Sequence, residues 1–278
     1  MFPNHVPNPE NGEAMDSICQ AVKAAHADLG VIFDTDVDRG AAVDSLGEEI
    51  SRNRLVALAS AIALEGNEGG TVVTDSITSD GLKEYLETTL GGKHHRFKRG
   101  YKNVINEAVR LNQEGVNCPL AIETSGHAAM RENHFLDDGA YLVTKILIKM
   151  ASLRKEGKDL NDLLAPLREP VEAAEVRLPI TEEDFRARGQ ALITALETYA
   201  QEQNWAIAPD NREGIRVSFP KGEGEGWFLL RLSVHDPILP VNFESDAPGG
   251  NKLIAQKLLA FLEGHKEGID ITPLEQFV

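Results

Sequence analysis

Residues 71–80, TVVTDSITSD, join a short β-branched run to a polar tail. Two other runs in the first half of the chain, Leu29–Phe33 and Pro119–Ile122, are also followed by polar tails. Weaker runs lie at 40–44 and 95–97, and stretches expected to be helical separate the runs: Met15–Ala25, Arg52–Glu65, Gly81–Leu90, Tyr101–Asn112 and Gly139–Leu153. Short apolar runs between helices are typical of strands buried on both faces of a sheet. The sequence therefore predicts an α/β fold with a layered, mixed sheet, whose ligands gather at the carboxyl ends of the strands.

The pattern changes after a helical linker at residues 151–170. The rest favours, in order, a strand, a long helix, a hairpin, a strand and a final helix: Glu172–Leu178, Thr181–Gln203, Gly214–Phe219 with Trp227–Leu232, Leu239–Glu244 and Asn251–Glu263. Thr181 is the expected N-cap of the long helix, because three acidic residues follow it in the first turn. This order predicts a small α+β C-terminal domain, with a boundary near Lys155–Pro170.

Composition narrows the classes of partner. The 278 residues suffice for two domains, and the formal net charge of −16 argues against nucleic acid and anionic membranes as partners. No apolar run reaches the length of a membrane helix. Cys19 and Cys118 lie in no CxxC motif, which argues against zinc and redox motifs and fits a reducing cytoplasm. A cytoplasmic protein is expected, and a local basic pocket or a metal ion could still bind a phosphorylated ligand.

The stretch after Phe33 reads DTDVDR and contains three aspartates, Asp34, Asp36 and Asp38, at alternate positions. In an extended chain their side chains point the same way, and such carboxylates repel one another unless a cation neutralises them. Oxygen ligands favour a hard cation, above all Mg²⁺. Arg39 could then hold a phosphoryl oxygen. A solvated acidic turn is the alternative, and the spacing favours the metal site.

The stretch after residue 122 reads ETSGH. It offers a carboxylate, two hydroxyls and an imidazole within five residues, from Glu123, Thr124, Ser125 and His127. This set of donors and acceptors suits the hydroxyls of a sugar. A strand-to-loop turn with an exposed histidine explains the same residues equally well.

Two further segments are candidates for phosphate contacts. Lys93–Lys102 is a dense basic run in an acidic chain, and Lys102 lies at the start of a predicted helix. In the segment Arg231–Pro237, RLSVHDP, Arg231 and Ser233 alternate with apolar residues and are expected to share one face of a strand. Both segments could instead be ordinary solvated surface.

Taken in order, these segments resemble the α-D-phosphohexomutases, the phosphoglucomutase and phosphomannomutase family. DTDVDR resembles the family's metal loop, ETSGH its sugar loop, Gly100-Tyr101-Lys102 its Gly-x-Lys segment, and RLSVHDP its phosphate loop. The N-terminal FPNHVPNPEN is similar to the stretch that leads to the metal loop. The sequence departs from the family pattern at several places: Thr35 and Ile122, where glycine is usual, His235-Asp236, which replaces Thr-Glu, and Pro240, where a basic residue is common.

The resemblance implies a four-domain isomerase of carbohydrate metabolism with a central cleft. It implies that residues 1–47 are the C-terminal remnant of domain II, 48–158 domain III, and 159–278 the α+β domain IV. The implied roles are Mg²⁺ binding by Asp34, Asp36 and Asp38; catalysis by Arg39, Lys102 and His127; sugar binding by Glu123, Thr124, Ser125 and His127; and phosphate binding by Arg231 and Ser233.

The serine loop that becomes the family's phosphoserine is absent from the 278 residues. The resemblance therefore implies a C-terminal part of the enzyme, inactive by itself, whose partners are its N-terminal domains and a hexose phosphate. The substrate could be a glucose or a mannose 1- or 6-phosphate, because ETSGH does not specify the configuration at C2.

Two other functions compete with this interpretation. In a haloacid dehalogenase-like phosphatase, Asp34 would be the nucleophile and Asp36 the acid and base, with Asp137-Asp138 as the second acidic motif. That class leaves ETSGH and RLSVHDP unexplained. A phosphosugar-binding protein without catalytic activity is the third hypothesis.

Overall fold

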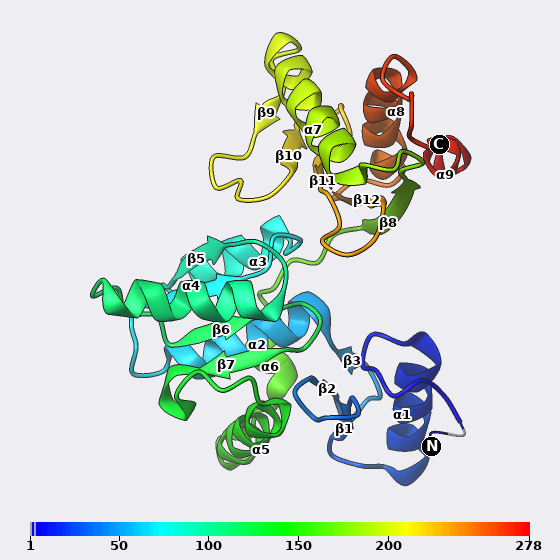
Figure 1. The fold of residues 1–278 in the computed structure, drawn as a ribbon. Helices are drawn as coiled ribbons and strands as arrows, with labels where there is room; N and C mark the ends of the chain where they lie inside the picture. Colours follow the sequence, from blue (N-terminus) through cyan, green and yellow to red (C-terminus); the bar gives the residue numbers. More distant parts are fainter. Residues whose placement is uncertain (1, 3) are drawn as a thin grey trace. The chain divides into compact units, whose positions relative to one another are not determined.

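The run TVVT forms β4 (Thr71–Thr74), which lies inside a four-stranded sheet of order β5-β4-β6-β7 (Figure 1). Its neighbours β5 (Lys93–Arg96) and β6 (Leu120–Ile122) both run parallel to it, and β7 (Ala128–Met130) pairs antiparallel with β6. The sheet is therefore mixed. This computed structural model describes Phe2 and residues 4–278, which divide into two units, 1–168 and 169–278.

Helices cover both faces of this sheet. Val73 and Val72 are adjacent on β4 and point to opposite faces, because side chains alternate along a strand. Val73 packs with buried residues of α4 (Tyr101–Gln113), whereas Val72 joins a larger core with α2 (Arg52–Leu64) and α5 (Gly139–Lys155). The predicted α/β layered fold is confirmed.

The N-terminal residues form a small sheet of their own. Strands β1 (Gly30–Phe33), β2 (Gly40–Val43) and β3 (Glu49–Ile50) pair antiparallel in chain order. Met15 and Val22 of α1 (Gly12–Ala25) pack on Ala41 and Val43 of this sheet. The turn between β1 and β2 carries the three aspartates.

The first unit ends at Arg168, inside the boundary region predicted near Lys155–Pro170. Its last helix, α6 (Leu160–Leu164), begins with a capping box between Asp159 and Asp162. Leu160 and Leu164 are buried in the core that contains α2 and α5, so this segment belongs to the first unit and the unit ends at Arg168.

The second unit is a five-stranded antiparallel sheet of order β8-β12-β11-β10-β9 with two long helices. One core unites the sheet with α7 and α8. The elements are β8 (Glu172–Pro179), α7 (Phe185–Glu202), β9 (Ala206–Ile207), β10 (Ile215–Phe219), β11 (Gly226–Leu230), β12 (Ile238–Ser245), α8 (Gly250–Glu263) and α9 (Thr272–Phe277). This is the small α+β domain that the sequence predicts.

Several local predictions were wrong. Helix α7 starts at Phe185 and not after Thr181, because the Asp184 carboxylate accepts a hydrogen bond from the Ala187 amide, while the Thr181 amide donates to the carbonyl of Gly268. The helix expected at residues 81–90 is α3 (Asp80–Glu84) followed by a π-helical turn, η1 (Tyr85–Thr89).

A 3₁₀ turn, η2 (Arg131–Asn133), follows β7. No described helix is both long and apolar enough to cross a membrane.

Candidate active site

The aspartate loop is a tight turn. Val37 has a positive φ of 66°, so Asp34, Asp36 and Asp38 converge through a bend in the backbone and not through an extended chain. One carboxylate oxygen from each of the three lies within 4.8 Å of the others. Arg39 closes the turn, since its Nε donates to Asp34 Oδ2 at 2.7 Å and its amide donates to Asp34 Oδ1 at 3.2 Å. This group could hold a metal ion.

The second loop, Glu123–His127, turns at Gly126, which has a φ of 100°. The Glu123 amide donates to the His127 carbonyl at 2.9 Å, and the Glu123 side chain accepts a hydrogen bond of 2.6 Å from the amide of Gly100. The Thr124 hydroxyl donates to Asp75 Oδ2 at 2.8 Å. The buried hydroxyl of Ser125 has no hydrogen-bond partner among the described residues. Of the two hydroxyls in the loop, Ser125 therefore offers the free one.

The two loops touch each other. The Gly40 amide donates to the Gly126 carbonyl at 3.2 Å, and Arg39 and His127 form an isolated β-bridge. A Cβ atom at Gly126 would lie 2.7 Å from the carbonyl oxygen of Gly40, so only glycine fits without movement. Beside the contact, Thr124, Ser125 and Gly126 line a hollow of about 360 Å³ together with residues from α1 and β2. The aspartate loop and the Ser-Gly-His turn are thus adjacent, although neither the loop's aspartates nor His127 line that hollow.

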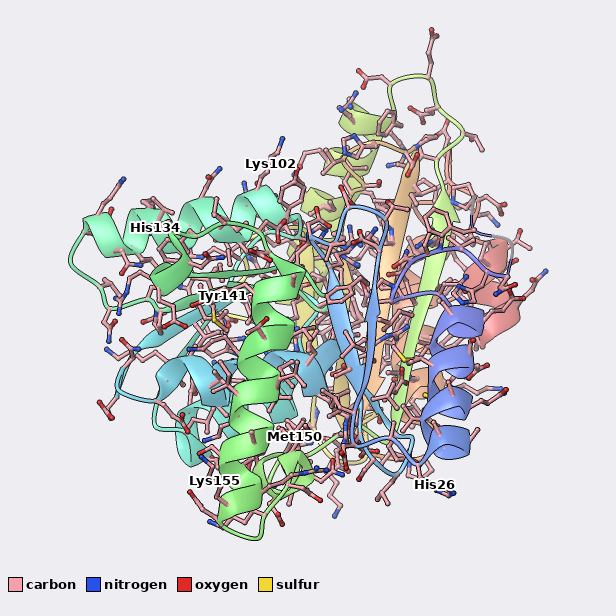
Figure 2. The ribbon with its side chains drawn as sticks, turned by 90° about the horizontal axis from the view of Figure 1, so that it is seen from below. His26, Lys102, His134, Tyr141, Met150 and Lys155 are labelled. Atoms are coloured by element: carbon pink, nitrogen blue, oxygen red, sulfur yellow. The ribbon has the colours of Figure 1, made fainter. Side chains whose placement is uncertain are left out.

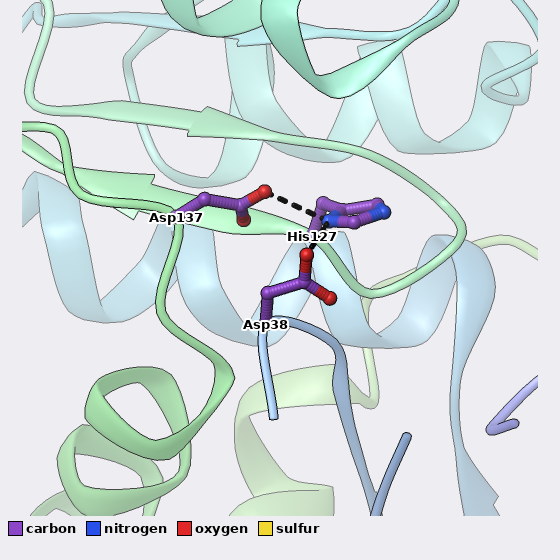
Figure 3. A group of neighbouring side chains, drawn as sticks. All are labelled: Asp38, His127 and Asp137. Atoms are coloured by element: carbon purple, nitrogen blue, oxygen red, sulfur yellow. Dashed lines mark hydrogen bonds and ion pairs between the residues drawn. The ribbon is translucent and has the colours of Figure 1, made fainter. Parts of the chain in front are cut away.

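His127, the last residue of the second loop, contacts two carboxylates (Figure 3). Its Nδ1 is 2.8 Å from Asp137 Oδ2 and 3.7 Å from Asp38 Oδ2. The ring also stacks on Tyr101, with centroids 4.9 Å apart. These contacts hold the imidazole in place and leave Nε2 as the nitrogen that can meet a ligand.

Burial and neighbouring charges act on the acidic groups in opposite directions. Burial alone would raise the pKa of Asp34, but the hydrogen bonds and charge of Arg39 keep that pKa below its usual range. Burial, followed by the charges of Asp34, Asp137 and Asp36, raises the pKa of Asp38. Burial also raises the pKa of Glu123 to about 7, helped by the charge of Asp75.

Burial would lower the pKa of His127. The hydrogen bond and charge of Asp137, and the charges of Asp38 and Glu123, outweigh burial and raise it.

Two residues of the basic run, Lys102 and Arg99, differ in their contacts. Lys102 is exposed on α4, where it projects outward in Figure 2, and its Nζ lies 5.7 Å from the centroid of the Tyr101 ring. Arg99, three residues earlier, lies 3.9 Å from Asp75 and 3.6 Å from Glu10. Arg99 therefore neutralises carboxylates around the site, whereas Lys102 lies at its edge.

Arg231 and Ser233 belong to the second unit. Strand β11 ends at Leu230, so the two residues lie in a loop and do not share a strand face as expected. The loop is closed by the Ser233 amide, which donates to the Ile238 carbonyl at 3.0 Å, and by the Asp236 amide, which donates to Ser233 Oγ at 3.3 Å.

The sequence prediction missed three residues of this site, Asp75, Arg99 and Asp137. Asp75 directly follows the buried strand β4, so its position at a strand end was a usable signal. Asp137 was considered only as part of a phosphatase motif with Asp138. Asp138 instead caps α5 by accepting a hydrogen bond from the Tyr141 amide, while Asp137 binds His127. No sequence pattern pairs residues 127 and 137.

Two family descriptions match the chain. Residues 1–47 match "Phosphoglucomutase/phosphomannomutase, alpha/beta/alpha domain II", and residues 51–170 match "Phosphoglucomutase/phosphomannomutase, alpha/beta/alpha domain III". Both loops of the candidate site lie within these matches.

Proteins and structures of this family resemble the chain over most of its length. It is 30% identical over 246 residues to a phosphomannomutase/phosphoglucomutase of Pseudomonas aeruginosa, covering 88% of this chain and 49% of the relative. It is 28% identical over 265 residues to a phosphoglucomutase of Neisseria gonorrhoeae, covering 95% and 54%. The crystal structure of a phosphoglucomutase/phosphomannomutase family protein from Burkholderia thailandensis matches with a TM-score of 0.78 and 26% identity, covering 97% and 54%. The chain spans about half the length of these relatives.

Proposed function

The chain belongs to the α-D-phosphohexomutase family, and on that premise we propose that it is the C-terminal part of a phosphoglucomutase/phosphomannomutase. The reaction is an intramolecular phosphoryl transfer on a hexose phosphate, through a phosphoserine supplied by another segment of the enzyme. The contact between the aspartate loop and the Glu123–His127 loop carries the proposal, since it joins a metal-binding group to a group that can bind a sugar.

The aspartate loop fits Mg²⁺. Its ligands are all oxygens, and the buried Oδ1 of Asp38 has no hydrogen-bond partner among the described residues. Asp34, Asp36 and Asp38 would hold the ion, which supplies charge neutralisation for phosphoryl transfer. Arg39 positions the loop through Asp34 and brings a second positive charge to the same place.

The Glu123–His127 loop supplies the sugar contacts. Ser125 offers a buried hydroxyl with no partner among the described residues, and Glu123 offers a carboxyl whose pKa burial raises to about 7. Thr124 supports the loop through Asp75. His127 Nε2 exchanges a proton with a sugar hydroxyl during transfer, while Asp137 keeps Nδ1 protonated. Lys102 would take part in catalysis if its long side chain turned towards the substrate.

The remaining assignments rest on the family pattern. Arg231 and Ser233 would bind the phosphate that does not react, and residues 1–47, 48–158 and 159–278 would correspond to domains II, III and IV. Glucose and mannose phosphates both remain substrates under this proposal. The two free cysteines, Cys19 and Cys118, agree with a cytoplasmic enzyme.

Complementation tests the proposal. The chain is mixed or co-expressed with an N-terminal half that carries the serine loop, and conversion of glucose 1-phosphate or mannose 1-phosphate to the 6-phosphate is measured with added Mg²⁺. We expect turnover only when both parts are present, and a loss of about a hundredfold or more for His127→Ala. Hydrolysis of p-nitrophenyl phosphate by the chain alone would contradict the proposal and favour a phosphatase. Sugar-phosphate binding without any rescue would contradict it in favour of a binding protein.

A further inference from the structure

Asp75 is a carboxylate that the reaction described above does not use. It directly follows β4, is fully buried at 0% exposure, and stands beside Glu123, because Thr74 and Ile122 are partners in the parallel β4–β6 register. Neighbouring strands lie about 4.8 Å apart, so the register brings two buried acidic side chains together at one edge of the sheet.

The two carboxylates have different hydrogen-bond partners. Asp75 accepts hydrogen bonds from the hydroxyl of Thr124 at 2.8 Å and from its amide at 3.3 Å. Glu123 accepts from the amide of Gly100, in the turn before α4. The loop is therefore anchored at two consecutive residues, Thr124 through Asp75 and Glu123 through Gly100.

Charged groups from three segments surround the pair. Arg99 lies 3.9 Å from Asp75 and 3.6 Å from Glu10. The groups that act on Glu123 are Asp75 from β4, Arg99 from the turn before α4, and His127 from its own loop. Asp75 and Glu123 are thus two buried carboxylates at neighbouring strand ends, and the charge of Asp75 adds to burial in raising the pKa of Glu123.

We propose that Asp75 is the positioning residue of the Glu123–His127 loop: it anchors the loop at Thr124 and places its negative charge beside Glu123. Burial and the charge of Asp75 together raise the pKa of Glu123 to about 7, so its carboxyl can donate as well as accept a hydrogen bond near neutral pH. A carboxyl in this state can donate to one sugar oxygen and accept from the next, which suits a pair of adjacent hydroxyls. The sugar part of this inference rests on the proposed function. The coupling of Asp75 to Glu123 does not.

The test is a titration of Glu123 in the complete chain, followed by carboxyl ¹³C NMR of labelled glutamate and assigned by Glu123→Gln. Asp75→Asn removes the charge and keeps an oxygen that can accept from Thr124. We expect the midpoint of Glu123 to fall by about one pH unit. Thr124→Val removes the hydroxyl and keeps the charge, so the midpoint should stay nearly unchanged while amide exchange in residues 123–127 becomes faster.

Asp80→Asn is the matched control, because Asp80 lies in the same segment after β4 but its side chain is 46% exposed and pairs with Arg96. An unchanged midpoint in Asp75→Asn, or an equal change in Asp80→Asn, would overturn the inference. Thermal unfolding verifies that each variant is folded. In the complemented enzyme, Asp75→Asn should mainly raise KM and shift the pH profile. Absence of turnover in the unmutated complemented enzyme would count against the proposed function and leave the titration result intact.

Discussion

The pKa of the Glu123 carboxyl is raised because the group is buried and lies beside a second carboxylate, that of Asp75. It rises from an ordinary 4.5 to about 7. Asp34 is also buried, but Arg39 contributes two hydrogen bonds and a full charge, and its pKa falls instead. The difference between the two residues lies in their partners, since both are nearly inaccessible to solvent.

The Glu123 group should make stability depend on pH. Since its pKa is higher in the folded state than in the unfolded state, its contribution is complete below about pH 4.5 and is lost as the pH rises to about 7. At about 1.4 kcal/mol per pKa unit, the loss is about 3 kcal/mol. Urea unfolding of the wild type and of Glu123→Gln between pH 5 and pH 8 measures it as the pH-dependent difference between the two proteins. Parallel profiles for the two proteins would contradict this prediction.

Asp38 should control metal binding. Asp38→Asn keeps the size of the side chain and removes one of three converging charges, so the affinity for Mg²⁺ is expected to fall at least about tenfold. Isothermal titration calorimetry measures the affinity. Asp28→Asn is the control, because Asp28 is 68% exposed and pairs with Arg154, away from the loop. Equal affinity in the two variants would argue against a metal site at the aspartate loop.

At the scale of elements, the site depends on close backbone contact between two turns. Gly126 approaches Gly40, and Gly139, at the start of α5, approaches the carbonyl carbon of Arg39, where a Cβ would lie 2.7 Å away. The start of a helix and two strand-end turns thus meet with no room for side chains. This close packing sets the position of the aspartate loop against the Glu123–His127 loop.

Gly126→Ala should disturb this arrangement. The substitution combines a positive φ with a Cβ too close to the Gly40 carbonyl, so we expect a loss of about 2–4 kcal/mol of unfolding free energy and weaker Mg²⁺ binding. Gly115→Ala is the control, since Gly115 also has a positive φ of 84° but nothing lies within 4 Å of its Cβ position. Urea unfolding of the two variants separates backbone strain from the clash. Equal losses would show that the contact with Gly40 is unimportant.

At the scale of the whole molecule, each of the two units has an apolar core of its own. The core of residues 169–278 is made of its own sheet and helices, with Leu258, Phe228 and Phe243 fully buried or nearly so. The core beneath the site is built around α2, α5 and the mixed sheet. Each unit has the apolar interior that independent folding requires.

Residues 169–278 expressed alone should therefore fold cooperatively, as circular dichroism and thermal unfolding can test. In the complete chain, Leu258→Ala should cost the second unit about 2–5 kcal/mol and leave the titration of Glu123 unchanged. A Glu123 midpoint that moves with Leu258→Ala, or an unfolded fragment, would contradict the independence of the two cores.

The sequence by itself determined the order of elements and the chemistry of their ends. Val72 and Val73 predict a strand buried on both faces, and the polar tails after β1, β4 and β6 predict where a ligand binds, because both signals are local. The sequence also indicates the candidate site residues for the same reason: the three aspartates, Arg39 and the ETSGH residues. Strand β7 and the π-helical turn after α3 could not be predicted from the sequence, since three-residue strands and single turns are too short to show a periodic pattern of apolar residues.

Only the tertiary structure decided which residues act on one another. Asp137 reaches His127 across ten positions, and Asp75 reaches Thr124 across forty-nine. These pairs form because strand register and loop packing bring the groups together, and no spacing along the chain encodes that distance. The turn before α4 likewise brings Arg99 to 3.9 Å from the buried Asp75, whereas Lys102, on α4 itself, is exposed.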